Sequence, residues 1–403
     1  MAWQTKKLGE LTDICRGSSP RPICDTRYFE GGTVPWIKIA DATKSGKFLY
    51  ETKEHVNDYG ASFSRRLPPG TILVAASGTL GYTQILGVEG CAHDGWLILQ
   101  NLRDLDRDFA YYALKTLEQH FFNSGSGAAI QNINTDILRQ AEIPHPPLPA
   151  QQRIAGILSS YDELIENCQR RIRILEAMAR ALYREWFVHF RFPGHEKHPR
   201  VASTLGDIPQ GWEVEKLANV AEVNRAQISA RTAPEELHYI DISSVSPGQI
   251  DSITTYAFAD APGRARRIVQ HGDVLWSCVR PNRRSYAQVI HPNPDTIAST
   301  GFAVLTATKV PFTFLYFITT TDDFVAFLTN NATGAAYPAV SGATFEKADL
   351  LIPPAPLLKK FGEATIPMAE EIHSLQRLIQ NLRQTRDLLL PRLLSGQIEI
   401  GNN

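Results

Sequence analysis

Two stretches of the chain carry apolar residues at spacings that alternate between four and three. They cover residues 154–186 and 361–393, in one register at an offset of 207 residues. A mean repeat of 3.5 residues predicts two long helices that pair along a coiled-coil seam. The alternative is two separate amphipathic helices, each packed on its own domain. The predicted seam consists of Ile165, Ile172, Leu175, Leu182, Ile372, Leu375, Ile379, Leu382 and Leu389.

Prolines and a glycine mark the expected ends of these helices. Pro149 and Pro356 stand at the helix starts, where a missing backbone N–H is harmless. Pro391 lies inside the second pattern, so we expect it to kink the helix or to end its regular part. The pair Ser395-Gly396 then stops the helix.

The region before each helix has a mixed pattern. Apolar residues alternate with a period of two over 71–75 and 274–279, which predicts strands bounded by Gly and Pro. Shorter helical patterns follow over 109–121 and 312–327. Each region therefore reads as a domain of α+β type.

The two halves of the chain repeat one another. Trp3-Gln-Thr-Lys-Lys-Leu8 returns as Trp212-Glu-Val-Glu-Lys-Leu217, and further matches follow in the same order at offsets of 202 to 209 residues. Residues 191–210 between the halves are rich in Pro, Gly and charge, which is typical of a linker. We expect a first domain over 1–148, a helix over 149–190, a linker over 191–210, a second domain over 211–355, and a second helix with a tail over 356–403.

Composition narrows the class of protein. The 403 residues suit two or three domains, and 43% hydrophobic with 21% charged residues is typical of a globular protein. Five widely spaced cysteines without a C-x-x-C pair favour a reduced compartment. No long apolar stretch and no leader-like apolar run are seen, so we expect a cytoplasmic protein.

An internal repeat with paired helices makes a pseudo-dimer. If the helices pair antiparallel, the two domains stand at opposite ends of a rod, as in DNA-binding dimers that touch two half-sites. The same architecture suits a scaffold that holds two partner proteins. The pattern alone leaves both functions open.

Several motifs resemble one known family. They are the Trp-x3-Lys-Leu openings at Trp3 and Trp212, the segment 143–154 (Ile-Pro-His-Pro-Pro-Leu-Pro-Ala-Gln-Gln-Arg-Ile), the segment 205–212 (Leu-Gly-Asp-Ile-Pro-Gln-Gly-Trp) and the segment 388–398 (Leu-Leu-Leu-Pro-Arg-Leu-Leu-Ser-Gly-Gln-Ile). Together they resemble the specificity subunit of type I restriction-modification systems. One departure is 357–361 (Leu-Leu-Lys-Lys-Phe), which lacks the usual Gln of the second proline-rich exit.

The resemblance implies an α+β fold with two pseudo-repeated target recognition domains, separated by two long helices that form an antiparallel coiled coil. It also implies that each domain reads one half of a split, asymmetric sequence in double-stranded DNA. Two methyltransferase (modification) subunits and the restriction (translocase–nuclease) subunits are the implied partners. The subunit itself is then not an enzyme and needs no cofactor, since S-adenosylmethionine belongs to the modification subunit.

The chemistry of the residues fits a protein without catalytic activity. The chain has neither a phosphate-binding G-x-x-x-x-G-K-[ST] motif nor the Asn/Asp-Pro-Pro-aromatic loop that an adenine methyltransferase needs. Asp41 with Glu51 and Lys53 is a weak candidate for a metal nuclease. His195 and His198 lie in the linker without a nearby Cys, so we expect no metal site there. A stand-alone DNA-modifying enzyme and a scaffold that does not bind DNA remain the alternatives.

A net charge of −1 implies that any DNA contact is local. Residues 1–150 hold 15 basic and 16 acidic side chains, and residues 211–355 hold 11 and 14. Arginine clusters and loops of small polar residues are therefore the candidates, because guanidiniums and hydroxyls bind phosphates and base edges. In the first domain they are Ser18, Ser19, Arg21, Ser62, Arg65, Arg66, Ser77, Thr79, Gln131 and Asn132. In the second domain they are Arg264, Arg266, Arg267, Arg280, Asn282, Arg283, Arg284, Ser285 and Tyr337.

Overall fold

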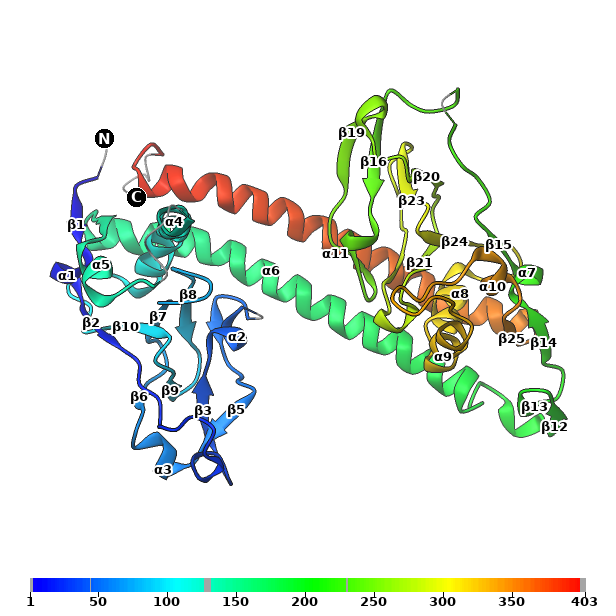
Figure 1. Ribbon diagram of the computed structural model, residues 1–403, viewed down its shortest axis with the longest axis horizontal. Coiled ribbons are helices and arrows are strands. Elements are labelled where there is room, and N and C mark those ends of the chain that lie inside the picture. The colour runs from blue at the N-terminus through cyan, green and yellow to red at the C-terminus, as the bar shows by residue number, and fades with distance from the viewer. Residues whose placement is uncertain (1–2, 44, 127–131, 230, 399–403) are drawn as a thin grey trace. The chain divides into compact units, whose positions relative to one another are not determined.

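The protein falls into two compact units in the computed structural model (Figure 1), which describes residues 3–398 except 44, 127–131 and 230. The first unit contains Met1–Gln169 and Arg377–Asn403, and the second contains Arg170–Gln376. Each long helix therefore contributes one part to each unit. No helix among the described residues has both the length and the apolar character that a membrane crossing requires.

The first unit is built on two sheets and a small strand pair. The five-stranded sheet has the order β2 (Asp13–Arg16), β10 (Trp96–Gln100), β7 (Ile72–Ala75), β8 (Thr83–Leu86), β4 (Phe48–Leu49). The four-stranded sheet has the order β5 (Glu54–Val56), β3 (Val34–Ile37), β9 (Gly90–Ala92), β6 (Arg65–Leu67). The pair is β1 (Thr5–Lys7) with β11 (Glu142–Pro144). The helices are α1 (Leu8–Leu11), α2 (Ile39–Ala42), α3 (Asp58–Ala61), α4 (Arg107–Ser126) and α5 (Thr135–Gln140), with the 3-10 turn η1 (Thr26–Tyr28).

The second unit repeats this strand order. One sheet runs β15 (Ala221–Val223), β24 (Phe302–Ala307), β21 (Val274–Ser277), β22 (Tyr286–Gln288), and the other β19 (Thr254–Ala257), β16 (Glu236–Ile240), β23 (Thr296–Ser299), β20 (Ala265–Ile268). The small pair is β14 (Glu213–Lys216) with β25 (Asp349–Ile352). The parallel pair β3–β9 has its counterpart in the parallel pair β16–β23. The predicted repeat and the α+β class are confirmed.

The remaining short elements of the second unit are connectors. They are α7 (Leu217–Val220), α8 (Phe312–Thr319), α9 (Asp322–Asn330), α10 (Gly342–Glu346), β17 (Val245–Ser246), β18 (Gln249–Ile250), η4 (Ile242–Ser244), η5 (Phe258–Asp260) and η6 (Pro281–Arg283). The segment predicted as a linker is more ordered than its composition indicates. It carries η3 (His195–Lys197) and a hairpin of β12 (Arg200–Ser203) and β13 (Gly206–Pro209), whose turn uses a positive φ of 95° at Gly206.

The predicted single helix over 312–327 is wrong, because threonines divide it into α8 and α9. The Thr319 hydroxyl donates to the Leu315 carbonyl at 2.7 Å, and the Thr320 hydroxyl donates to the Tyr316 carbonyl at 2.8 Å. Thr321 then caps α9 by accepting the Phe324 N–H at 3.2 Å. Hydroxyls that bond the backbone locally compete with helix continuation, so a run of three ends one helix and starts the next.

The two long helices are α6 (Leu148–Tyr183), which continues as the π-helical turn η2 (Arg184–Val188), and α11 (Ala355–Leu394). Pro149 and Pro356 each occupy the second residue of their helix. Pro391 does not end α11, which continues through it to Leu394. Pro391 is exposed, so the carbonyl that loses its N–H partner can be solvated, and the helix stops at Gly396 with φ 75°.

The two helices run antiparallel within each unit. In the first unit Asp162 of α6 pairs with Arg386 of α11 at 2.5 Å, and Ile154 shares a core cluster with Leu393. In the second unit Arg171 pairs with Glu371 at 2.5 Å, and the rings of Tyr183 and Phe361 lie 6.2 Å apart. Residue numbers therefore rise along α6 as they fall along α11. Of the predicted seam, Ile165, Leu375 and Ile379 are buried, and the other members, Ile172, Leu175, Leu182, Ile372, Leu382 and Leu389, are half-buried.

Candidate nucleic-acid interface

One edge of the paired sheets gathers candidate loops of the first domain. β2 ends at Arg16 and β7 ends at Ala75, while their partner β10 begins at Trp96. In the second sheet β6 begins at Arg65, opposite Ala92 at the end of β9. The loops 17–20, 76–81 and 93–95 therefore leave the sheets at the same edge.

Asp94 is the centre of this edge. The Arg21 guanidinium bonds to its carboxylate, Arg16 Nε donates to its carbonyl at 2.7 Å, and its N–H donates to Ser19 Oγ at 3.2 Å. Arg65 Nε donates to the Arg16 carbonyl at 2.8 Å. The Arg21 side chain is still 67% exposed. A carboxylate that orients a guanidinium while its other N–H groups stay exposed prepares it to bind a phosphate or a base edge.

Two more serines join the edge through backbone contacts. Ser64 Oγ donates to the Ser18 carbonyl at 2.6 Å, and Ser77 lies next to Gly95, where an added Cβ would meet its hydroxyl at 3.6 Å. The hydrogen bond from Ile133 N–H to the Ala76 carbonyl at 2.8 Å brings Asn132 beside the loop 76–81. Asn132 and Thr79 are exposed there. Gln131 lies outside the described residues.

Ser62 and Arg66 do not join the cluster around Asp94. Ser62 Oγ donates to the Tyr59 carbonyl at 2.7 Å at the end of α3. Arg66 pairs with Glu89 at 2.5 Å, since successive side chains of a strand point to opposite faces and Arg65 already faces Arg16. The adjacent arginines that look like one motif in the sequence therefore make separate contacts.

The equivalent edge of the second domain carries Arg264, Arg266 and Arg267. Arg267 opposes Ala298 of β23 as Arg65 opposes Ala92 of β9, so the two strands place an arginine at matching positions. Arg264 lies 3.5 Å from the Asp241 carboxylate and is 59% exposed. Arg266 instead stacks over the Phe258 ring at 5.4 Å, and Arg267 is half-buried.

A strained loop next to this edge presents the remaining arginines. Arg280 and Arg284 flank η6 with left-handed φ angles of 51° and 58°, a cost that proteins retain mostly at functional sites. Arg280 lies over the Tyr337 ring at 4.6 Å, and Tyr337 is 70% exposed. Arg284 pairs with Asp322 at 2.5 Å. Among the described residues, the exposed Arg283 has no hydrogen-bond or ion-pair partner for its guanidinium.

Asn282 and Ser285 belong to the same loop but contribute differently. Asn282 is exposed, whereas Ser285 is half-buried and its carbonyl accepts the Ser277 N–H at 2.9 Å. The loop is held against 333–339 by the bridge between Val279 and Ala339. Arg280, Asn282, Arg283 and Tyr337 thus come together from segments more than fifty residues apart.

Three polar residues at these edges were missed by reasoning from the sequence. Lys38 lies over the Trp36 ring at 4.7 Å and pairs with Glu54 at 2.6 Å. His93 Nδ1 accepts the Gly95 N–H at 2.9 Å, and burial lowers the pKa of His93, which favours the neutral ring that this bond requires. Asp94 is the third. All three residues come just after β3 or β9, two strands that pair in parallel. They could be predicted as neighbours only if this strand pairing were known.

The side chains of Asp41, His195 and His198, three of the weak candidates for a catalytic or metal site, make structural contacts. The Asp41 carboxylate accepts the backbone N–H groups of Lys38 and Lys53 at 3.0 and 3.1 Å, which caps α2. His195 and His198 pack against Phe192, at ring distances of 6.2 and 5.4 Å.

A polar network joins the first domain to both long helices. The Tyr112 hydroxyl donates to Asp162 at 2.5 Å, and burial raises the pKa of Tyr112, so the hydroxyl keeps its proton. The other oxygen of Asp162 accepts from Arg386. Lys47, buried beneath the domain, donates to Ser159 Oγ of α6 at 2.7 Å. The first domain is thereby attached to both long helices.

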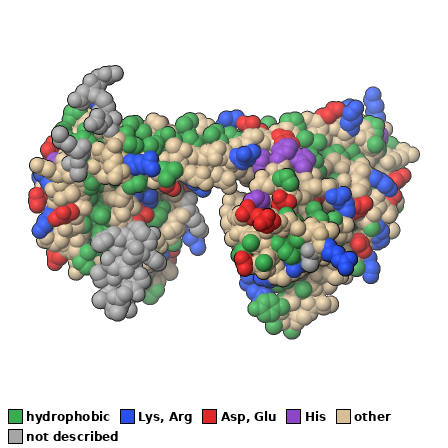
Figure 2. Space-filling view, turned by 90° about the horizontal axis from the view of Figure 1, so that it is seen from above, with side chains coloured by type: hydrophobic (Ala, Val, Ile, Leu, Met, Phe, Trp, Pro, Cys, Tyr) green, Lys and Arg blue, Asp and Glu red, His purple; other side chains and the backbone are tan. Residues whose placement is uncertain are grey.

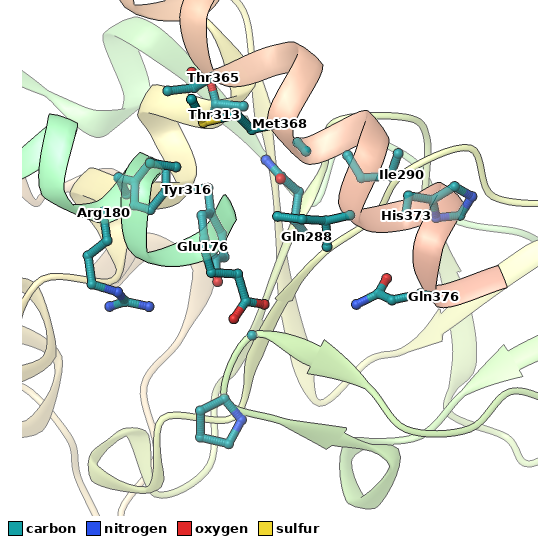
Figure 3. Close-up of a pocket in the computed structure, with 16 residues that line it drawn as sticks. Glu176, Arg180, Gln288, Ile290, Thr313, Tyr316, Thr365, Met368, His373 and Gln376 are labelled. Carbon is teal, nitrogen blue, oxygen red and sulfur yellow. Dashed lines mark hydrogen bonds between the residues drawn. The ribbon is translucent and has the colours of Figure 1, made fainter. Parts of the chain in front are cut away.

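The described residues of the second unit form no such network, and a cavity lies at the equivalent place. The helix offset of 207 puts Ala369 at the position of Asp162, and Ala179 at the position of Arg386. Both alanines line a cavity of about 130 Å³. Figure 3 shows Glu176, Arg180 and Tyr316 on one side of it and His373 and Gln376 on the other. The lining shares no residue with the candidate DNA-contacting loops.

The basic side chains on the face in Figure 2 form no large positive region, which agrees with the net charge of −1. On the face in Figure 2, Lys and Arg side chains are scattered among acidic and uncharged ones, without a continuous basic field. On this face a polyanion would therefore contact small clusters of basic side chains.

Comparison with known proteins points to one family. Residues 2–177 match the family model described as the type I restriction modification DNA specificity domain. The type I restriction enzyme MjaIX specificity subunit of Methanocaldococcus jannaschii is 24% identical over 99% of this chain and 94% of its own length. The MjaVIII specificity subunit of the same organism is 22% identical over 99% of this chain and 94% of its own length.

A solved structure has the same fold over almost the whole chain. The S subunit of the type I restriction-modification system from M. genitalium superposes with a TM-score of 0.63 at 16% identity, and covers 99% of this chain and 97% of its own.

Proposed function

We propose that this chain, which belongs to the family of type I restriction-modification specificity subunits, reads a DNA target made of two separated half-sites. One observation carries the proposal. The pair of sheets is duplicated, and each copy bears an arginine-rich set of loops at the same edge. Because those loops differ in sequence between the copies, each reads its own half-site.

The two edges offer different kinds of DNA contact. In the first domain the Asp94 carboxylate orients Arg21, and hydrogen bonds to the backbone hold Ser18, Ser19 and Arg65 nearby. This fixed geometry suits direct readout of a base. The Arg283 guanidinium in the second domain has no partner among the described residues, and the nearby Tyr337 ring is exposed beside Arg280. An exposed aromatic ring beside guanidiniums suits packing against the DNA together with phosphate contact.

The proposal also assigns the chemistry to partner proteins. The relatives are named specificity subunits, and we propose that two modification subunits and the restriction subunits act on the DNA that this chain selects. The long helices support such docking, since Leu164, Ile174 and Met178 of α6 are each more than half exposed. Co-purification of the chain with modification subunits tests this part.

We propose a division of the chain into domains that follows these roles. Recognition domains span 1–148 and 211–355, a first helix spans 149–190, a connection spans 191–210, and a second helix with a C-terminal tail spans 356–403. The ordered hairpin β12–β13 makes that connection a fixed element of the second unit.

Removing Arg21 or Arg283 is expected to weaken DNA binding and leave folding intact. Loss of one base contact weakens binding to the cognate duplex by about 1–3 kcal/mol, or roughly 5- to 150-fold. Loss of one phosphate contact also lowers the salt slope by about one. Gel shifts of Arg21→Ala and Arg283→Ala, alone and with modification subunits, measure both quantities over a salt series.

One arginine and one lysine that lie away from these edges supply the controls. Arg103, which pairs with Asp13 at the opposite end of β2, and Lys309, which follows β24, are expected to bind DNA normally as alanine variants. If Arg21→Ala and Arg283→Ala bind as tightly as the parent, these loops are not the interface. If the chain shows no salt-sensitive binding to DNA, the alternative of a scaffold that does not bind DNA is favoured. If the purified chain alone methylates or cleaves DNA, the alternative of a stand-alone DNA-modifying enzyme is favoured.

A further inference from the structure

Two histidines and a glutamate meet on the surface of the second unit. His271 precedes β21, His291 follows β22, and Glu370 lies on α11. His291 Nε2 is 2.6 Å from one oxygen of the Glu370 carboxylate, and His271 Nε2 is 3.6 Å from the other. The three ligand-type atoms all lie within 4.8 Å of one another. Figure 2 shows histidine side chains grouped together on the exposed surface.

The fold holds these groups in place. His271 sits in a tight turn before Gly272, whose φ is 87°, and its ring packs edge-on against Phe312 at 5.0 Å. His291 has a left-handed φ of 45°, which aims its side chain back toward His271, and the two rings are 4.5 Å apart. Glu370 is fixed in the middle of a long helix. Two loops and one helix thus direct three donors to one point.

The donor set and its spacing fit a metal ion. Imidazole nitrogen and carboxylate oxygen are common zinc ligands, and two histidines with one glutamate can bind zinc, with water completing the shell. A tetrahedral ion at about 2.0 Å from each ligand atom separates those atoms by about 3.3 Å. The observed separations of 2.6 and 3.6 Å lie on both sides of that value.

We propose that His271 Nε2, His291 Nε2 and the Glu370 carboxylate bind one divalent transition-metal ion, with zinc as the best match. This site is independent of the proposed DNA function. It would fasten β21 and β22 of the second recognition domain to α11, all within the second unit. In the first unit the network of Tyr112, Asp162 and Arg386 makes the corresponding attachment.

Two hydrogen bonds set a limit on the affinity. The metal must replace the bond between His291 Nε2 and the Glu370 carboxylate at 2.6 Å, and a second contact involves His271. The His291 backbone N–H points at Nδ1 of His271 at 3.4 Å. A neutral imidazole that binds metal through Nε2 carries its proton on Nδ1, so loading must break this long bond and turn the ring. Exposure of the two histidines adds competition from water. We therefore expect a weaker site than a closed structural zinc centre.

Metal binding to the full, tag-free chain tests the proposal. We expect one zinc ion per chain by titration against a chromophoric chelator, and a rise in Tm when zinc is added to chelator-treated protein. Glu370→Gln and His291→Ala should each weaken binding at least about 10-fold and abolish the rise in Tm. Cobalt should give the visible absorption bands of a low-symmetry site in the parent and lose them in both variants.

The matched control is His189→Ala, because His189 is an exposed histidine of the same unit outside this cluster. It should bind zinc and cobalt like the parent. Three results would overturn the site: less than one ion per chain at saturation, equal affinity in Glu370→Gln and the parent, or equal losses in His189→Ala. A Tm that responds to pH but not to metal would assign the cluster to a His–Glu ion pair instead.

Discussion

Replacing Asp162 by alanine is expected to reduce the free energy of unfolding of the first unit by about 3–5 kcal/mol. The variant leaves the Arg386 guanidinium and the Tyr112 hydroxyl without the oxygens that they bond at 2.5 Å. Both bonds are shielded, since the side chains of Asp162 and Arg386 are 12% and 24% exposed. Arg386 keeps its hydrogen bonds to Asp387, but its Nη1 and the Tyr112 hydroxyl lose their charged acceptor in a place that water cannot fully reach. Urea denaturation followed by circular dichroism measures the change.

The neighbouring residue provides the control for this prediction. Glu163 is exposed on the same helix, and Glu163→Ala should change the free energy by about 0.5 kcal/mol or less. Replacing both partners, as Asp162→Leu with Arg386→Met, should recover most of the loss, because no charge then remains buried. A loss below about 1 kcal/mol in Asp162→Ala would show that the network does not anchor the domain.

Phe361→Ala is expected to destabilise the second unit by about 3–5 kcal/mol. Phe361 is fully buried and its ring centre lies 4.9 Å from Phe187, 6.2 Å from Tyr183 and 6.3 Å from Phe314. These rings come from α8, α11 and the end of α6, so the cavity would loosen the domain from both helices. Fluorescence of the buried Trp212 and Trp276 during urea unfolding reports on this unit.

Lys360→Ala is the matched control for the aromatic cluster. Lys360 is the exposed neighbour of Phe361 on α11, and its variant should unfold within about 0.5 kcal/mol of the parent. Phe361→Leu should fall between the two, because leucine fills part of the space. Equal unfolding midpoints for Phe361→Ala and the parent would mean that this cluster does not hold the unit together.

The sequence predicted those parts of the fold whose signals are periodic. Heptads at 154–186 and 361–393 mark α6 and α11, and alternation at 71–75 and 274–279 marks β7 and β21. Prediction from the sequence failed where single side chains form hydrogen bonds with the backbone that compete with the hydrogen bonds of a helix. The hydroxyls of Thr319, Thr320 and Thr321 divide one apolar pattern into two helices.

The candidate interface could be predicted in part, for a physical reason. Arginine clusters are visible in the sequence, but which of them converge depends on strand order. Arg65 and Arg66 are neighbours in the chain and diverge on β6, whereas Arg280 and Tyr337 lie 57 positions apart in the chain and come together. The same limit hid His271, His291 and Glu370, since residues so far apart in the chain form no recognisable motif.

The central claim is that each domain reads one half of a divided DNA target, and selection from a random duplex library tests it most directly. The chain with its modification subunits is incubated with the library, and bound duplexes are sequenced for the parent, Arg21→Ala and Arg283→Ala. We predict two short motifs separated by a fixed, unspecified spacer, with each variant relaxing one motif and leaving the other unchanged. A single uninterrupted motif, or relaxation of both motifs by either variant, would contradict the account.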